Sequence, residues 1–125
     1  MGTGIVDGLD PADVTRADSL GREILSDIAN KWALLIIECL GDDTLRFSAL
    51  RDGVEGVSHK MLTQNLRMLE RNGLLRRTVH PTVPPKVEYA LTESGQALRV
   101  TIDGMCDWTH TWLGHIEESR RRFDG

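Results

Sequence analysis

The chain has 125 residues, which suffices for a single hydrophobic core and excludes a large two-lobed catalytic cleft. Hydrophobic residues make up 40% of it and charged residues 27%, a balance typical of a folded domain and not of a disordered chain. The formal net charge of −4, taken as an average, argues against a protein that binds nucleic acid, because such proteins usually carry a basic surface.

The chain is predicted to open with a short flexible tail. Residues 1–9 are rich in glycine, and we expect a single domain to occupy residues 10–125. Asp10 followed by Pro11 is typical of a helix start, because an aspartate side chain caps free N–H groups and proline fits the first helical position. A secretory signal is not expected, since no basic start precedes an apolar run.

Two apolar helical stretches and a short helix are predicted next. Apolar residues recur at helical spacing up to Ile28, and again over residues 32–40. The spacing leaves open whether Asn30 divides these stretches into two helices. Residues 45–53 are expected to form a short helix. The longest apolar run, residues 33–37, is far shorter than the roughly 20 residues of a membrane span, so we expect no membrane partner and a cytoplasmic protein.

A helix over residues 58–72 carries the most informative surface. Ser58 is a good N-cap, and the Asn-Gly pair at 72–73 is a strong signal for the helix end. One face of this helix is a continuous polar stripe of Lys60, Gln64, Arg67 and Arg71. Residues 58–77 hold five basic residues and one acidic residue, a local charge of +4, whereas residues 1–30 carry −4. Because salt screens charges beyond about 8 Å, a partner that docks here would meet the local positive charge.

Two strands joined by a stiff loop follow. Residues 75–80 and 86–91 are predicted to be strands, and the five residues between them include three prolines, which cannot continue a ladder of hydrogen bonds. We therefore expect a β-hairpin over residues 75–91, with Arg77 and Lys86 making its ends cationic. A stiff projecting loop suits contact with the DNA backbone or minor groove, although a rigid surface hairpin without such a role has the same pattern.

A long helix over about residues 92–122 is predicted to hold two copies of the chain together. Thr92 caps its start, and its apolar residues repeat with a four-three rhythm that is typical of helices packing against each other. The predicted dimer interface consists of Leu98, Ile102, Met105, Trp108, Trp112 and Ile116.

The order of these elements predicts a mainly α fold with a small β-hairpin. The specific arrangement is a winged helix-turn-helix with N- and C-terminal dimerisation helices. Residues 58–72 would be the recognition helix, which lies in the major groove of DNA, and residues 75–91 would be the wing.

The stripe on the recognition helix has the chemistry that DNA requires. Lys60 and Arg67 suit a phosphate or a guanine, and Gln64 suits the edge of an adenine. Further donors near the helix N-terminus, where free N–H groups also attract phosphate, are Ser58, His59 and Thr63. A solvated polar face is the alternative interpretation of such a stripe, but its place between a short helix and a basic hairpin favours DNA.

These residues resemble the HxlR-type transcriptional regulators, winged-helix proteins allied to the MarR group. The resemblance covers roughly residues 20–115 and is carried by the motifs KW (31–32), RFSAL (46–50), GVSHKMLT (56–63), VPPKVEY (83–89) and LTESG (91–95), together with Leu66, Leu69, Gly73, Leu74, Arg77 and Trp108. The proline-rich hairpin that leads into Tyr89 is its most specific part.

The resemblance implies a homodimeric bacterial regulator that binds a near-palindromic operator in double-stranded DNA. Its dimer would form through the terminal helices. Arg46 would begin the short supporting helix close to the DNA backbone, and the hairpin that holds Arg77 and Lys86 would be the wing. We therefore predict a sequence-specific DNA-binding regulator, expected to be a repressor that a small molecule releases.

Two alternatives concern the two cysteines, whose number implies no disulfide framework. Many members of the family carry a sensor cysteine before the first core helix, where this chain has Leu20 instead. A thiol-responsive regulator would then use Cys106 in preference to Cys39, which lies on an apolar face. Cys106 and His110 have a spacing that can hold a metal, but a closed site needs three or four ligands, so no metal is expected.

Three further hypotheses complete the sequence-based picture. A winged helix used only for protein–protein contact would show apolar anchors on the 58–72 helix. An effector pocket between helices would be lined by Trp32, Trp108 and Trp112, which otherwise fill the dimer core. Enzymatic activity is not expected and no cofactor is implied, because no nucleophile–base pair is found and adjacent helical residues diverge by about 100°.

Overall fold

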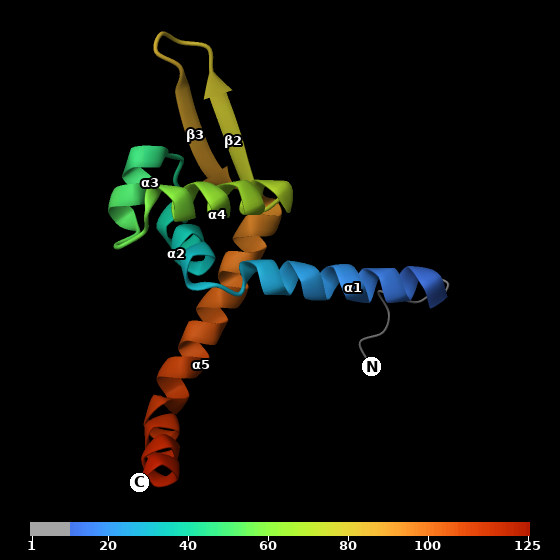
Figure 1. The fold of residues 1–125 in the computed structure, drawn as a ribbon, viewed down its shortest axis with the longest axis vertical. Helices are drawn as coiled ribbons and strands as arrows, with labels where there is room; N and C mark the ends of the chain where they lie inside the picture. The colour runs from blue at the N-terminus through green and yellow to red at the C-terminus, as the bar shows by residue number, and fades with distance from the viewer. Residues whose placement is uncertain (1–10) are drawn as a thin grey trace.

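The computed structural model describes residues 11–125, with side chains from Asp18 onward, and the predicted tail over residues 1–9 lies outside this part. It contains five helices and three strands along the described chain. The helices are α1 (Pro11–Ile28), α2 (Lys31–Leu40), α3 (Phe47–Gly53), α4 (His59–Arg71) and α5 (Glu93–Asp124), and the strands are β1 (Leu45–Arg46), β2 (Leu75–His80) and β3 (Lys86–Leu91). Figure 1 shows their arrangement.

Asn30 separates the two apolar stretches into α1 and α2, which settles the point that spacing left open. Its side-chain oxygen accepts a hydrogen bond from the backbone N–H of Ala33 at 2.9 Å, and its amide donates to the Asp27 carbonyl at 2.8 Å. The side chain thus caps the new helix and holds the end of the old one.

The sheet has three strands in the order β1-β3-β2, one strand more than the predicted hairpin. β1 pairs antiparallel with β3, with Leu45 opposite Tyr89 and Arg46 opposite Glu88. The prediction of a helix over residues 45–53 was therefore wrong for its first two residues. Arg46 is extended, with φ −86° and ψ 165°, and the helix begins only after it.

The core lies between α2, α4, the sheet and the first turns of α5. α2 buries Ile36, Ile37 and Leu40 completely, and α4 contributes Leu62 and Leu69. Leu98 packs against this core and Ile102, only 5% exposed, belongs to it. The structure thus places these two residues inside the protomer, whereas the sequence assigned them to the dimer interface.

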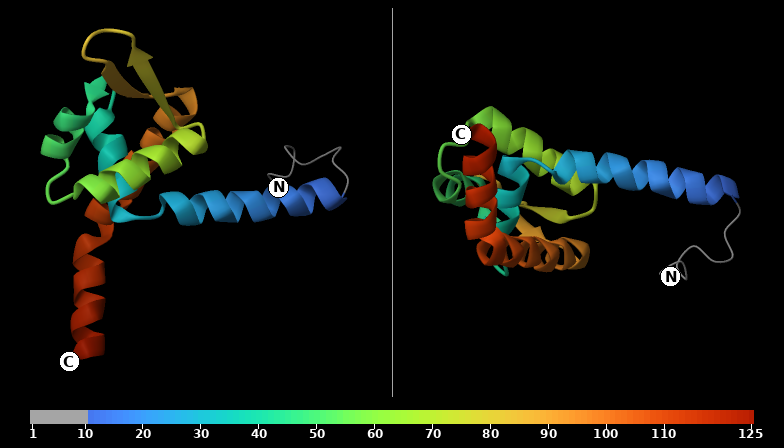
Figure 2. Two further views of the ribbon diagram at one scale, coloured as in Figure 1. Left: turned by 45° about the horizontal axis from the view of Figure 1, so that its top comes forward. Right: turned by 90° about the horizontal axis from the view of Figure 1, so that it is seen from below.

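The molecule is a winged helix with two projecting helices, which confirms the predicted fold class. The hairpin of β2 and β3 is the wing and points away from the body, while α5 leaves it in the opposite direction (Figure 1). Both views in Figure 2 show α1 reaching sideways from the body. Within the described residues, no helix is both long and apolar enough to cross a membrane.

Candidate nucleic-acid interface

The start of α4 is fixed by its own cap and by α3. The Ser58 hydroxyl oxygen accepts a hydrogen bond from the backbone N–H of Met61 at 3.1 Å, so the predicted N-cap is confirmed. The His59 ring lies against the Phe47 ring of α3, with 4.8 Å between the ring centroids. The Ser58 hydroxyl acts as an acceptor in this bond, so its hydrogen can still be donated to another group. The cap and the ring contact hold α4 at a defined angle to α3, as a helix-turn-helix requires.

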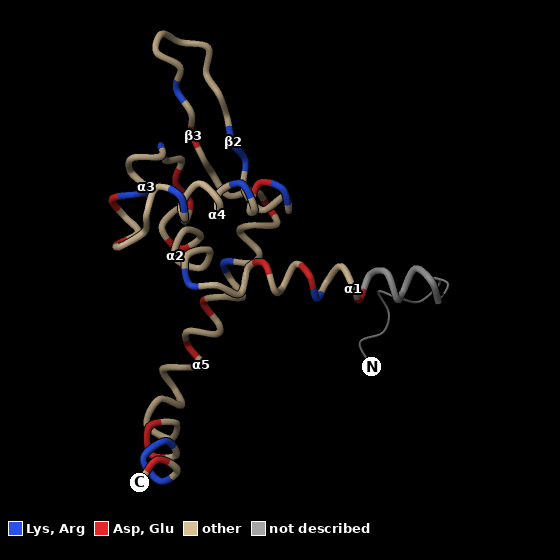
Figure 3. Tube along the Cα trace, viewed as in Figure 1, with Lys and Arg blue, Asp and Glu red and all other residues tan. Residues whose placement is uncertain are grey.

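The outer face of α4 is polar and open to solvent. Lys60, Gln64, Arg67 and Arg71 are all exposed, and none of them forms an ion pair with a side chain among residues 18–125. No large apolar side chain of α4 belongs to the exposed set in this part of the chain. The helix therefore lacks the apolar anchors expected of a surface that only docks proteins. Figure 3 shows basic residues along α4 and the base of the wing, and acidic residues on α1.

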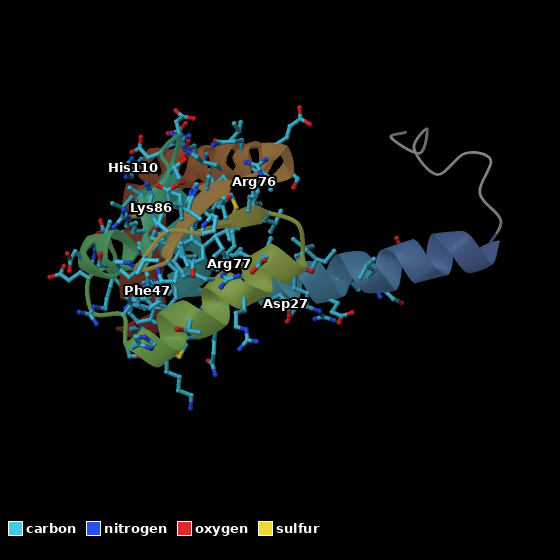
Figure 4. The ribbon with its side chains drawn as sticks, turned by 90° about the horizontal axis from the view of Figure 1, so that it is seen from above. Asp27, Phe47, Arg76, Arg77, Lys86 and His110 are labelled. Atoms are coloured by element: carbon cyan, nitrogen blue, oxygen red, sulfur yellow. The ribbon has the colours of Figure 1, made fainter. Side chains whose placement is uncertain are left out.

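The cations of the wing are divided between the two faces of the sheet. Side chains alternate along a strand, and Arg77 pairs with Tyr89, so both lie on the face that also holds Leu45. Lys86 and Arg76 lie on the other face. Figure 4 shows Arg77 beside α4, with Lys86 and Arg76 on the far side of the hairpin. Of these three cations of the hairpin, Arg77 alone therefore lies on the face next to α4.

A hollow of about 400 Å³ lies between α4 and the sheet. Its lining consists of Phe47, Thr63, Leu66, Arg67, Glu70, Arg77 and Tyr89. Arg67 of α4 and Arg77 of the wing thus border the same space, and Thr63 is half-buried beside them. The sequence predicted each of these three residues as a DNA contact without indicating that they meet.

Lys86 is engaged within the wing. Its Nζ lies 3.7 Å from Glu88 Oε2, and the Nε2 of His80 lies 2.7 Å from Glu88 Oε1. The hydrogen bond with His80, followed by the charges of Lys86 and Arg46, holds the pKa of Glu88 below its ordinary value of 4.5. Glu88 was not predicted as a functional residue, although its spacing of two residues from Lys86 puts both on one strand face.

The fold should lose stability in acid through Glu88. A carboxyl whose pKa is lowered by folding stabilises the folded state above pH 4.5, and this contribution disappears as the pH falls through the lowered value. Between about pH 7 and about pH 3, the free energy of unfolding measured with urea should therefore fall less for Glu88→Gln than for the unmodified chain. Equal losses in the two proteins would contradict this assignment.

The three tryptophans are not brought together. Trp32 is half-buried beside Gly56, and the Nζ of Lys31 lies 4.7 Å from the centroid of its ring. Trp108 and Trp112 are 58% and 49% exposed on the projecting part of α5. Neither of the two described hollows is lined by any of them, since the second lies between α1 and the end of α4. Neither of these two hollows is therefore the predicted effector pocket, which stays a prediction.

The two cysteines have different surroundings. Cys39 is half-buried, and burial together with the Asp43 carboxylate raises the pKa of its thiol, which leaves less of the reactive thiolate. Cys106 is exposed on α5. No group of three or more His, Cys, Asp or Glu side chains suited to a metal ion is found among residues whose side chains are described, and this includes the surroundings of His110.

Known proteins with similar sequences and structures are transcriptional regulators. Residues 27–117 match the family model described as HxlR-like helix-turn-helix. The HTH-type transcriptional regulator YtfH of Escherichia coli K12 is 44% identical over 95 residues, which cover 76% of this chain and 75% of YtfH.

Two solved structures support the same assignment. The transcriptional regulator ytfH from Salmonella typhimurium matches with a TM-score of 0.70 and 40% identity, over 81% of this chain and 90% of its own. The redox regulator HypR in its oxidized form matches with a TM-score of 0.65 and 36% identity, over 72% and 93% of the two chains. The chain therefore belongs to the HxlR-like helix-turn-helix family, as its motifs predicted, and is a DNA-binding transcriptional regulator of the HTH type.

Proposed function

We propose that the chain is a sequence-specific repressor that binds a near-palindromic operator as a homodimer and is released by a small molecule. The observation that carries this proposal is the polar stripe of α4, which is exposed and makes no ion pairs with the described side chains. Its Arg67 lines one hollow together with Arg77 of the wing. A helix with such a stripe can contact base edges in the major groove while the cations beside it contact phosphates.

A gel-shift experiment tests the proposal most directly. The purified chain is mixed with a duplex from the region upstream of its own coding sequence and, separately, with a random duplex of equal length. We expect a complex with the upstream duplex that survives a large excess of the random one. Equal competition by the two duplexes would contradict sequence-specific binding.

The proposed homodimer rests on the apolar stripe of α5. Leu98 and Ile102 lie at its start and are covered by the protomer's own core, whereas Met105, Trp108 and Trp112 continue the stripe without cover. An exposed apolar surface of this extent marks an interaction site, and a second copy of the chain is the partner that two-fold symmetry favours. α1 adds Leu20 and Leu25, both exposed, to the uncovered apolar surface.

Glutamate at both Trp108 and Trp112 should separate the dimer into monomers, because charges would be buried in an apolar seam. Light scattering at micromolar concentration should show the mass of two chains for the unmodified protein and of one chain for this variant. Val100→Glu is the matched control, since Val100 is exposed but lies two residues from Leu98 and so on the opposite side of α5. Dissociation by the control alone would contradict the proposed seam.

We place the response to a small molecule at this same seam. Trp108 and Trp112, exposed in one protomer, would enclose an apolar space between two copies. A ligand in this space would change the distance between the two α4 helices, which must match half-sites about 34 Å apart. The ligand would thereby lower the affinity for the operator.

A thiol-responsive regulator is the second candidate, favoured by the exposed thiol of Cys106 and by the similarity to HypR. In this case diamide would take two electrons and two protons from the Cys106 thiols of two copies and leave a disulfide between them. We then expect diamide to abolish DNA binding by the unmodified chain but not by Cys106→Ser. Equal loss in both proteins would exclude Cys106 as the sensor.

A further inference from the structure

Glu88 occupies the centre of one face of the sheet. It lies on the middle strand β3, opposite Arg46 on one side and Thr78 on the other. His80 and Lys86 form the next pair on the same face, just before the tip of the wing. Glu88 is therefore the carboxylate around which the charged groups of this face are arranged, and its side chain is 24% exposed.

Glu88 contacts Lys86, a cation that DNA would otherwise attract, and lies opposite a second one. One carboxylate oxygen lies 2.7 Å from His80 Nε2, and the other lies 3.7 Å from Lys86 Nζ. Arg46 is the residue directly across the ladder on β1 and is exposed. One negative charge thus offsets part of the three permanent positive charges, Arg46, Arg76 and Lys86, on this face of the sheet.

Stability alone does not account for this arrangement. Ion pairs with partly exposed side chains contribute at most about 1 kcal/mol, and often nothing measurable. Their effect on DNA is larger, because each phosphate contact changes the slope of log K against log salt by about 0.9. A carboxylate in the wing therefore acts mainly on sequence-independent binding, which depends on charge, and much less on base reading by α4.

We infer that Glu88 balances the charge of the wing and thereby keeps binding dependent on DNA sequence. It restrains Lys86 and partly neutralises Arg46, so the wing adds less affinity for arbitrary DNA than its cations would supply alone. The inference rests on the proposed function, since it concerns the ratio of specific to non-specific binding. In this role Glu88 is a positioning residue that acts through Lys86 and does not itself touch a base.

The test uses Glu88→Gln, which removes the charge and keeps an oxygen that can accept a hydrogen bond from His80. Affinity is measured by fluorescence anisotropy over a range of salt concentrations, for the upstream duplex and for a random duplex. We expect random-duplex binding at about 0.1 M salt to strengthen about five- to tenfold for each protomer, with a salt slope steeper by about one per protomer. Binding to the upstream duplex should strengthen less, so the ratio of the affinities for the upstream and random duplexes should fall. Unchanged affinity and slope on the random duplex would overturn the inference.

Two further variants separate this role from others. Glu117→Gln makes the same change in net charge near the far end of α5, and it should leave both duplexes unaffected. In a Lys86→Gln background, Glu88→Gln should produce less than half of its gain, and an undiminished gain would refute the restraint of Lys86. Failure of the unmodified chain to prefer the upstream duplex would contradict the proposed function. Unchanged affinity and salt slope of Glu88→Gln on the random duplex would contradict only this inference.

Discussion

Alanine at both Lys60 and Arg67 should lower the affinity for DNA by about several thousandfold at about 0.1 M salt. A dimer would lose four cations, and each phosphate contact contributes about 0.9 to the slope of log K against log salt. The slope should therefore become shallower by about four. If one of the two side chains also reads a guanine, specificity at that base pair should relax by a further 1–3 kcal/mol, as is typical of a bidentate contact.

The matched control removes the same charge far from α4. Arg120 and Arg121 lie at the end of α5 and are exposed. Alanine at both positions lowers the net charge equally and should leave the slope within about one unit of the unmodified value. Equal slopes for the two double variants would mean that overall charge, and not the stripe of α4, sets the affinity. Circular dichroism of each variant checks that the fold persists.

Local signals in the sequence predicted the ends of helices well. Ser58 and Thr92 cap α4 and α5 in the structure, and Gly73, with φ +75°, follows α4 at the predicted stop. Each of these signals depends on atoms within about four residues of one another, so no information about distant contacts is needed.

Features that depend on distant contacts were not predicted. β1 has only two residues, too few for a period, and it exists because Leu45 and Arg46 pair with β3 some forty residues later. The four-three rhythm of α5 predicted one apolar face. It could not show that the first part of this face, at Ile102, is covered by the chain itself while Trp108 is not. Periodicity reports which side of a helix is apolar, but the partner of that side is set by the tertiary fold.

The same limit applies to the candidate interface. The stripe of α4 follows from helical spacing and could be derived without a structure. The meeting of Arg67 with Arg77, and the pairing of Glu88 with His80, depend on the hairpin register and on how the hairpin packs against α4. A register prediction for a hairpin with a proline-rich loop would have been needed to find them.

Gly95 is the position where a single methyl group should have the largest effect on stability. It is buried in the first turn of α5, and a Cβ there would overlap the carbonyl oxygen of Leu74 and come within 3.2 Å of Leu91 Cδ2. The carbonyl belongs to the backbone and is held in place, since it accepts a hydrogen bond from the Thr92 N–H at 3.0 Å. The strain therefore cannot be relieved by rotation of a side chain.

The start of α5 cannot easily move away from this contact either. The hydroxyls of Thr92 and Ser94 both donate to the Gly73 carbonyl, at 2.6 and 2.8 Å, and so tie the helix to the turn after α4. A displaced α5 would lose these bonds and would also pull Ile102 out of the core. Gly95→Ala should thus lower the free energy of unfolding by at least about 2 kcal/mol, the range observed for overpacked cores.

Gly104→Ala provides the matched comparison on the same helix. No atom lies within 4 Å of the position its Cβ would take, and the residue sits in the interior of α5. Alanine should therefore stabilise the protein there by about 0.5–1 kcal/mol, because it loses less backbone entropy than glycine on folding. Thermal unfolding of both variants at one protein concentration should give melting temperatures on opposite sides of the unmodified value. A Gly95→Ala protein as stable as the parent would show that α5 can shift on the turn at Gly73, and the close packing assigned to its first turn would be wrong.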